Sequence, residues 1–209
     1  NCKLIFEEAY KNRYVWPATF NGYGGKCIFK DNQKSIQGDF ILGSNFQPQV
    51  THISDKKIVK DISSQLFEVA IHRVKREFDE THRNNNFNFL GESKRGIEIE
   101  VSGKNKGDKY IVKDKKINMV FRKIHGVIIE IFVEEFLDTR YGFLSKKYTS
   151  QQLDIETLTP KSKLLEYEDN FINLGIDNIW ALESRNIKYI NEDDKEKFLN
   201  YSFKEIFTL

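Results

Sequence analysis

Residues 68–87 concentrate the side chains of this sequence that could do chemistry. This segment, EVAIHRVKREFDETHRNNNF, holds His72, Arg73, Glu77 and His82 among apolar residues at helical spacing. Imidazole, guanidinium and carboxylate groups take part in acid–base chemistry and in the binding of anionic groups. The segment is therefore either an assembled site or the end of an ordinary amphipathic helix.

A helical projection of the segment singles out Arg73 and Glu77. At ~100° per residue, Arg73 falls seven residues after Leu66 and four after Val69, on the apolar stripe, and Glu77 follows one turn later. A charged group that is buried alone is costly, so each of the two needs a partner. We expect either an ion pair between them near the end of the core, or an Arg73 guanidinium that holds the phosphate or carboxylate group of a ligand.

The histidines offer a second kind of chemistry. His72 lies at the edge of the apolar arc, and His82 lies at or beyond the helix end, where the helix dipole favours an imidazolium. His125 precedes a glycine in FRKIHGV. A metal site built from these three histidines, with Glu80 or Asp79 as the carboxylate, is one alternative, although the sequence has no HExxH or HxH motif to support it.

Several classes of protein are disfavoured by what the sequence lacks. Cys2 and Cys27 are the only cysteines and form no CxxC motif, so we expect neither a disulfide framework nor a zinc finger, and we expect a cytoplasmic or plastid-stroma location. There is no GxSxG motif of a serine hydrolase. The net charge is only +2, and the strand segments carry similar numbers of Glu and Lys, so we expect no nucleic-acid partner. No run approaches the roughly 18 apolar residues of a membrane span.

The elements that must position these residues can be predicted from periodicity. Apolar spacing predicts a short helix within residues 1–16, a hairpin around residues 31–34 and one long helix over about residues 55–82, capped by Ser54 or Asp55. Gly24 and Gly25 indicate a turn or bulge and not a phosphate loop, because no GK[ST] follows them. We therefore expect no cofactor.

From Phe87 onward the apolar period changes to two, with short turn segments between the runs. This arrangement is typical of an antiparallel meander, and the last run predicts that the sequence ends on a strand. Nine or more antiparallel strands tend to curl. We predict an α+β fold in a single domain over residues 1–209, in which a curled antiparallel half-barrel is closed by the long helix and accompanied by the short N-terminal helix.

Five segments carry a resemblance to a known family: GYGGKCIFK, LFEVAIHRVKREFDETHRNNNF, SGKNKGDKYIVKD, FRKIHGVIIEI and YGFLSKKYTS. Together they resemble the uncharacterised domain of unknown function 3386 of cyanobacteria and plastids, over most of the chain. The family implies no established activity, and it often has a histidine where this chain has Phe121. The order of elements looks like the lipoprotein-carrier half-barrel fold. That likeness implies a hollow lined by Ile62, Leu66, Phe87, Phe89, Ile129, Ile131, Trp180, Tyr201 and Phe203.

The function that we expect first is non-enzymatic binding. The half-barrel would hold an apolar or amphipathic small molecule, such as a lipid, an isoprenoid or a pigment, with Arg73 and either Arg122 or Arg140 at its polar end. One alternative is an interaction or assembly factor of the photosynthetic machinery, with a protein partner, a filled core and an exposed aromatic patch. The other is an enzyme, which requires that at least two members of one set lie within hydrogen-bond reach: His72, Glu77, His82 and His125.

Overall fold

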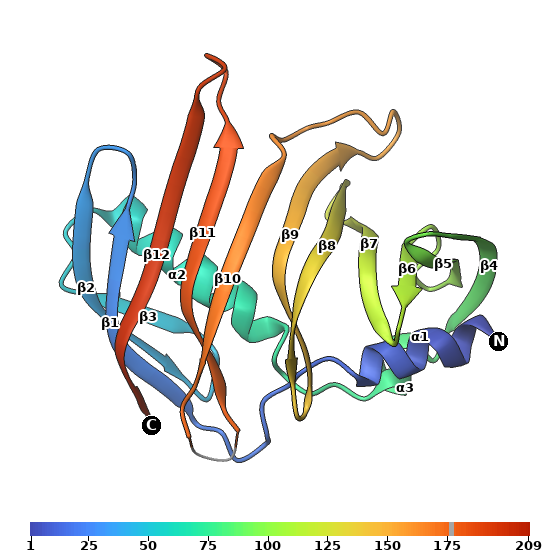
Figure 1. The fold of residues 1–209 in the computed structure, drawn as a ribbon, viewed down its shortest axis with the longest axis horizontal. Helices are drawn as coiled ribbons and strands as arrows, with labels where there is room; N and C mark the ends of the chain where they lie inside the picture. The colour runs from blue at the N-terminus through green and yellow to red at the C-terminus, as the bar shows by residue number, and fades with distance from the viewer. Residues whose placement is uncertain (176–177) are drawn as a thin grey trace. The chain divides into compact units, whose positions relative to one another are not determined.

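The computed structural model describes residues 1–175 and 178–209, and in these residues it contains three helices and twelve strands (Figure 1). The helices are α1 (Cys2–Lys11), α2 (Lys56–Ile71) and α3 (Phe78–His82). The strands are β1 (Gly22–Lys30), β2 (Ser35–Gly43), β3 (Pro48–Thr51), β4 (Asn85–Ser93), β5 (Gly96–Gly103), β6 (Lys109–Lys113), β7 (Lys116–Ile124), β8 (Val127–Thr139), β9 (Gly142–Asp154), β10 (Leu165–Asn173), β11 (Trp180–Ile190) and β12 (Glu196–Thr208).

The twelve strands belong to one sheet, and the described residues divide into two compact units. Unit 1 comprises residues 1–14 and 76–167, and unit 2 comprises residues 15–75 and 168–209. Each unit is therefore built from two separate segments of the chain. The predicted antiparallel meander is confirmed, because strands that follow one another in sequence from β4 to β9 are also neighbours in the sheet.

Unit 2 holds β3-β2-β1-β12-β11 and the part of β10 from Glu168 onward, in this sheet order, with α2 across one face (Figure 1). Helix α2 begins at Lys56 and is capped by Asp55, whose carboxylate accepts hydrogen bonds from the backbone N–H groups of Lys57 and Ile58 at 3.0 and 3.3 Å. This N-cap satisfies donors that a helix start leaves unpaired. The predicted apolar stripe is confirmed, since Ile58, Ile62, Leu66, Val69 and Ala70 are all buried.

The two glycines of β1 form a bulge, as predicted. The pairing of β1 with β12 shifts register between Gly24 and Lys26. A Cβ atom on Gly25 would lie 2.5 Å from the backbone oxygen of Lys204, so only glycine allows the two strands to approach this closely.

Unit 1 holds the strands in the order β9-β8-β7-β6-β5-β4, and α1 packs against β4, β6 and β7. The predicted short helix is confirmed as α1, although it ends at Lys11, before the expected limit at Pro17. Phe6, Ala9 and Tyr10 of α1 are buried. They form one core with the following buried residues from α3, β5 and β6: Phe78, Ile99, Val101, Tyr110 and Val112.

The prediction of a single long helix over residues 55–82 is wrong. Helix α2 ends at Ile71, where the N–H groups of His72 and Arg73 bond to carbonyls only three residues back, at 3.2 and 2.9 Å. Helices in proteins are held mainly by burial of an apolar face. Residues 72–77 offer one apolar side chain, Val74, so the helix stops and α3 begins separately at Phe78.

Two further observations on the fold concern strand β3 and the membrane. Strand β3 was not predicted from the sequence. No helix among the described residues is long and apolar enough to cross a bilayer.

Candidate ligand-binding face

Strands β7 and β8 carry the predicted site residue Arg122 on the same face as a strip of apolar side chains. The strand register pairs Arg122 with Ile129 and Val120 with Ile131. Residues that are directly paired in antiparallel strands project from the same face, and Val133 continues this face along β8. All five residues are half-buried, which leaves part of each side chain open to a ligand. We call Val120, Ile129, Ile131 and Val133 the apolar strip.

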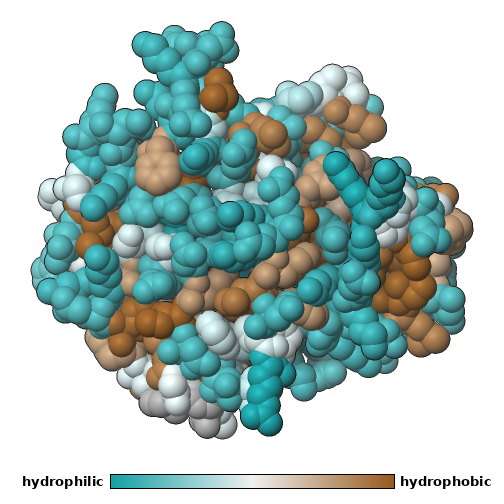
Figure 2. All heavy atoms as spheres, in the orientation of Figure 1, coloured by the Kyte–Doolittle hydropathy of each residue, from teal (hydrophilic) through white to brown (hydrophobic). Residues whose placement is uncertain are grey.

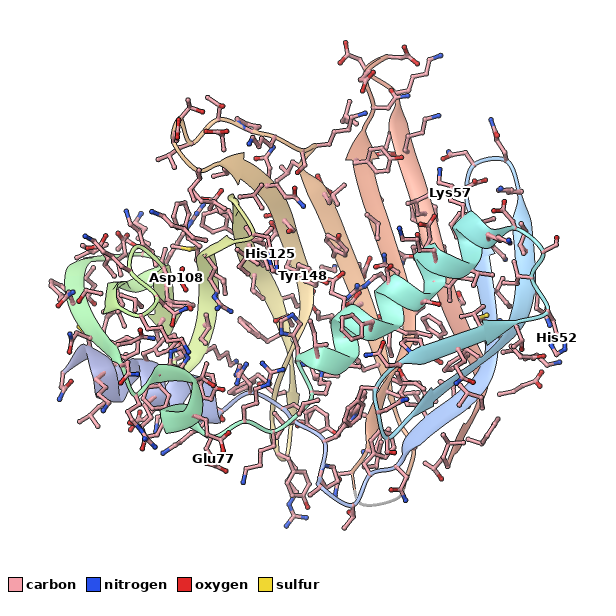
Figure 3. All side chains as sticks on the ribbon, turned by 180° about the vertical axis from the view of Figure 1, so that it is seen from behind. His52, Lys57, Glu77, Asp108, His125 and Tyr148 are labelled. Carbon is pink, nitrogen blue, oxygen red and sulfur yellow. The ribbon has the colours of Figure 1, made fainter. Side chains whose placement is uncertain are left out.

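Strand β9 extends this face beyond the apolar strip. Its Tyr148 pairs with Val133, and its Ser150 pairs with Ile131. The Tyr148 ring stacks on that of Tyr167, with centroids 4.7 Å apart and planes 6° from parallel. Figure 3 shows Tyr148 on β9. The face therefore has an apolar centre with an aromatic side chain next to it.

Arg122 is held at one end of the apolar strip by a buried carboxylate. Its Nε donates to Asp108 Oδ2 at 3.1 Å, and the backbone N–H of Lys123 donates to Asp108 Oδ1, also at 3.1 Å. The Asp108 side chain is 3% exposed, whereas that of Arg122 is 38% exposed. The carboxylate thus fixes one edge of the guanidinium and leaves other N–H donors able to reach a ligand.

A second polar group lies two positions before Val120 on β7. The side-chain oxygen of Asn118 is buried, and the described residues provide it with no hydrogen-bond partner. Buried polar atoms in folded proteins almost always have a partner. The register of β6 and β7 shifts at Asn118, since Ile111 pairs with Met119 and Val112 pairs with Ile117, and a water molecule would satisfy the Asn118 oxygen in this bulge.

His82, another predicted site residue, is buried among aromatic rings in unit 1. Its ring lies 5.1–5.3 Å from the rings of Phe6, Tyr10 and Phe78, centroid to centroid. Its Nδ1 lies 3.1 Å from Nδ2 of Asn85, which also donates to Asn105. The imidazole therefore packs as part of the core.

The electrostatics around His82 keep it neutral. Burial is the main cause that lowers its pKa from 6.5 to about 4, and the nearby positive charges of Arg122 and Arg13 lower it further. Burial also raises the pKa of the neighbouring Tyr110 above its usual range. At neutral pH, Arg122 and Arg13 are therefore cationic neighbours of an uncharged imidazole.

The predicted residues at the end of α2 do not share one helix. His72 is the exposed C-cap of α2. Arg73 follows it in unit 2, with its guanidinium carbon 5.7 Å from the centre of the Phe171 ring. Glu77 belongs to unit 1 and is the N-cap of α3, where it forms a capping box with Glu80. Arg73 and Glu77 both lie outside α2, which ends at Ile71, and the predicted ion pair between them stays a prediction.

The other two predicted residues lie in turns. His125 is exposed in the turn between β7 and β8, three residues after Arg122. Arg140 is exposed in the turn after β8, at the far end of that strand from the pairing partner of Arg122. Within unit 1 the structure brings Arg122 and His82 into electrostatic contact and leaves Arg140 apart from them. Among the described residues, no group of three or more His, Cys, Asp or Glu side chains could hold a metal ion.

Unit 2 contains a buried ion pair that was not predicted from the sequence. Arg185 on β11 donates to both carboxylate oxygens of Asp169 on β10, each at 2.7 Å, and both residues are 2% exposed. Gln65 of α2 accepts a further hydrogen bond from Arg185 at 2.9 Å. A signal was available, because Asp169 alternates with Leu165, Tyr167 and Phe171, and a charge in an apolar set needs a partner.

The residues predicted to line a hollow are distributed over both units. Phe87, Phe89, Ile129 and Ile131 belong to unit 1, and Phe89 is 61% exposed on β4. The remaining five belong to unit 2. Four of them are buried, namely Ile62, Leu66, Tyr201 and Phe203, and Trp180 is half-buried. Only Ile129 and Ile131 are part of the apolar strip.

Comparison with known protein families gives a match over the full chain. A family model described as "Protein of unknown function (DUF3386)" matches residues 1–209. No curated protein matches the chain.

Two solved structures are similar to the chain at low sequence identity. The crystal structure of LolA superfamily protein NE2245 from Nitrosomonas europaea is 7% identical, with 100% of this chain and 93% of that chain covered and a TM-score of 0.30. A structure of the MucA/MucB complex of Pseudomonas aeruginosa is 8% identical, with 95% and 90% covered and a TM-score of 0.23. At such low TM-scores we argue function from the geometry of the chain itself.

Proposed function

Because the chain belongs to the protein family of unknown function DUF3386, whose description gives no activity, we propose a function from its own geometry. We propose that it is a non-enzymatic binding protein. It holds an amphipathic small molecule on the face of β7–β9, with the apolar part against the apolar strip and an anionic group at Arg122.

The observation that carries this proposal is the position of Arg122 at the end of a half-buried apolar strip. A guanidinium with one edge fixed by Asp108 at 3.1 Å is pre-organised to accept a second anionic partner. A binding site of this kind is mostly apolar and has a few polar groups that fix orientation. The arrangement also matches the ligand class expected from the sequence.

The strand geometry limits the size of the ligand. Ile129, Ile131 and Val133 span four residues of β8, which is roughly 13 Å at ~3.3 Å per residue. Arg122 pairs with Ile129, so it lies at one end of this length. An apolar body of about this length with an anionic group at one end fits the face.

The charge at Arg122 can be tested with dodecanoate as the probe, below its micelle concentration, in isothermal titration calorimetry. We expect Arg122→Gln to weaken binding about tenfold, the loss of one partly exposed charge-assisted contact. Arg122→Gln alone leaves the buried Asp108 carboxylate with one partner fewer, which could destabilise the fold. The double variant Asp108→Asn/Arg122→Gln removes both charges of the pair and therefore serves as the control for stability. Equal affinity of the folded double variant and the natural protein would overturn the proposal.

The apolar strip can be tested with a pair of neighbouring substitutions. Ile131→Asn places an amide in the strip, whereas Phe132→Asn changes the next residue, which projects from the opposite face and contacts Arg95. We expect dodecanoate affinity to fall at least about tenfold in the first variant and to stay within about twofold in the second. The opposite ranking would place the ligand on the other face of the sheet.

Native mass spectrometry of the purified protein, compared with its denatured mass, tests whether a natural ligand is retained. An amphipathic molecule released on denaturation supports the proposal and identifies its class. A retained metal ion instead would favour chemistry at the histidines.

A second candidate function, protein interaction, is favoured by strand β4. This strand is at one end of the sheet order, and its Phe89 and Leu90 are 61% and 48% exposed. An exposed apolar edge strand is a template for pairing with another chain. If the protein copurifies with a partner, Phe89→Lys should release that partner, while dodecanoate binding stays unchanged.

A further inference from the structure

Unit 1 contains a hollow whose lining residues include none of the apolar strip. It has a volume of about 450 Å³ and is lined by α1, by the turn between β4 and β5, and by the turn between β6 and β7. Its floor is formed by Ile5, Ile97 and Val112. The first two are partly buried residues packed against the unit 1 core, and Val112 belongs to that core. The volume lies within the range of ordinary small-molecule sites.

The rim of this hollow carries equal numbers of positive and negative side chains. The acids are Glu8, Glu92 and Asp114, and the cations are Lys94, Lys113 and Lys115. Lys113 Nζ donates to the backbone oxygen of Lys94 at 3.1 Å, which holds its ammonium at the rim. A site with both signs around an apolar floor favours a ligand that carries both signs itself.

The turn that carries Asp114 and Lys115 is costly for these two residues. Their φ angles are +52° and +57°, a region in which glycine or asparagine is preferred in two-residue hairpin turns. The next hairpin of the same sheet follows that preference, with Gly126 at the second position of its turn. Backbone strain of this kind occurs most often where the side chains have a function.

A purely structural explanation of the strain is weak. Lys115 Nζ lies 3.7 Å from Glu8 Oε2, but both side chains are more than 60% exposed, and exposed ion pairs contribute little to stability. The hydrogen bond from Asn12 to the turn uses the backbone oxygen of Lys115, which glycine would also provide. The backbone of these two residues therefore stays in an unfavourable conformation although their side chains add little stability. Both side chains line the hollow.

We propose that this hollow is a binding site for a small zwitterionic molecule with a short apolar chain. The chain packs on Ile5, Ile97 and Val112. The anionic group of the ligand faces Lys113 and Lys115, and its cationic group faces the acids of the rim.

The test uses octylphosphocholine as the zwitterionic probe, with octyl sulfate and octyltrimethylammonium as probes of one charge, all below their micelle concentrations. Methyl NMR of the full chain reports binding at Ile5, Ile97 and Val112 directly. We expect these methyl signals to shift with the zwitterion, with an affinity about tenfold above that of either singly charged probe.

The variant Asp114→Asn/Lys115→Gly separates function from structure. It installs the preferred residues of such a turn, removes the charge of Asp114 and removes the whole Lys115 side chain, so we expect an equal or higher melting temperature together with an at least tenfold loss of zwitterion affinity. Asp194→Gly is the matched control, because it relaxes another exposed residue with positive φ, at +55°, and leaves the hollow unchanged. Retained affinity in the turn variant, equal binding of all three probes, or no shift of the three methyl signals would each overturn the proposal.

Discussion

Replacement of Arg185 by methionine should be among the most destabilising single changes in unit 2. Arg185 and Asp169 are both 2% exposed and are joined by two hydrogen bonds of 2.7 Å. Methionine preserves much of the side-chain volume but leaves the Asp169 carboxylate buried without its cation. Removal of one member of a buried pair costs about 3–5 kcal/mol. That loss is a large share of a total stability of about 5–15 kcal/mol.

Urea unfolding, followed by circular dichroism, measures this loss, and a double variant isolates its cause. We expect Arg185→Met to lower the unfolding free energy by about 4 kcal/mol and the melting temperature by about 10 °C. In Asp169→Leu/Arg185→Met neither charge remains, so we expect most of the loss to be recovered, with a coupling energy of at least about 2 kcal/mol. A single variant within about 1 kcal/mol of the natural protein, or a double variant that loses the sum of both single effects, would refute the reasoning.

Two further predictions concern pH and cooperativity. His82 has a pKa of about 4 in the folded protein, against 6.5 when unperturbed, so the folded state resists its protonation. The contribution of the neutral imidazole to the free energy of unfolding is therefore complete above pH 6.5 and is lost as the pH falls through 4, by up to about 3 kcal/mol. His82→Gln should flatten this part of the stability profile in urea titrations at about pH 7, 5.5 and 4.5, and parallel profiles would contradict the assignment. We also propose that both units fold as one domain, since each is made of two separate segments. Calorimetry should then show one transition, whereas two resolved transitions would count against it.

The elements that the sequence predicted well are those whose local signals agree with their burial. In α2, Asp55 is a cap residue, and the residues that follow repeat at helical spacing, so both the start and the buried stripe could be predicted. The end of α2 could not, because the charged residues 72–77 have adequate helix propensity. It is the absence of an apolar face to bury that ends the helix.

The candidate site was predictable only in part. Arg122 alternates with Val120 and Ile124 on β7, which marks a charge on an apolar face. Its partner Asp108 lies in a polar turn segment that gives no sign of burial, and only the register of β6 and β7 brings the two together. The grouping of Arg122 with Arg73 and Arg140 came from residue type alone, and residue type does not report distance in the fold.

The position of β12 in the sheet has a consequence for the order in which the nascent chain can fold. Strand β12 is made last among the strands, yet it pairs with β1 on one side and with β11 on the other. While the ribosome is still synthesising residues 196–208, β1 lacks its neighbour, and buried side chains of β1 such as Cys27 lack the cross-strand contact with Phe203. Unit 2 therefore cannot complete its sheet during translation of its first segment, and its open strands need protection from other chains until β12 is released.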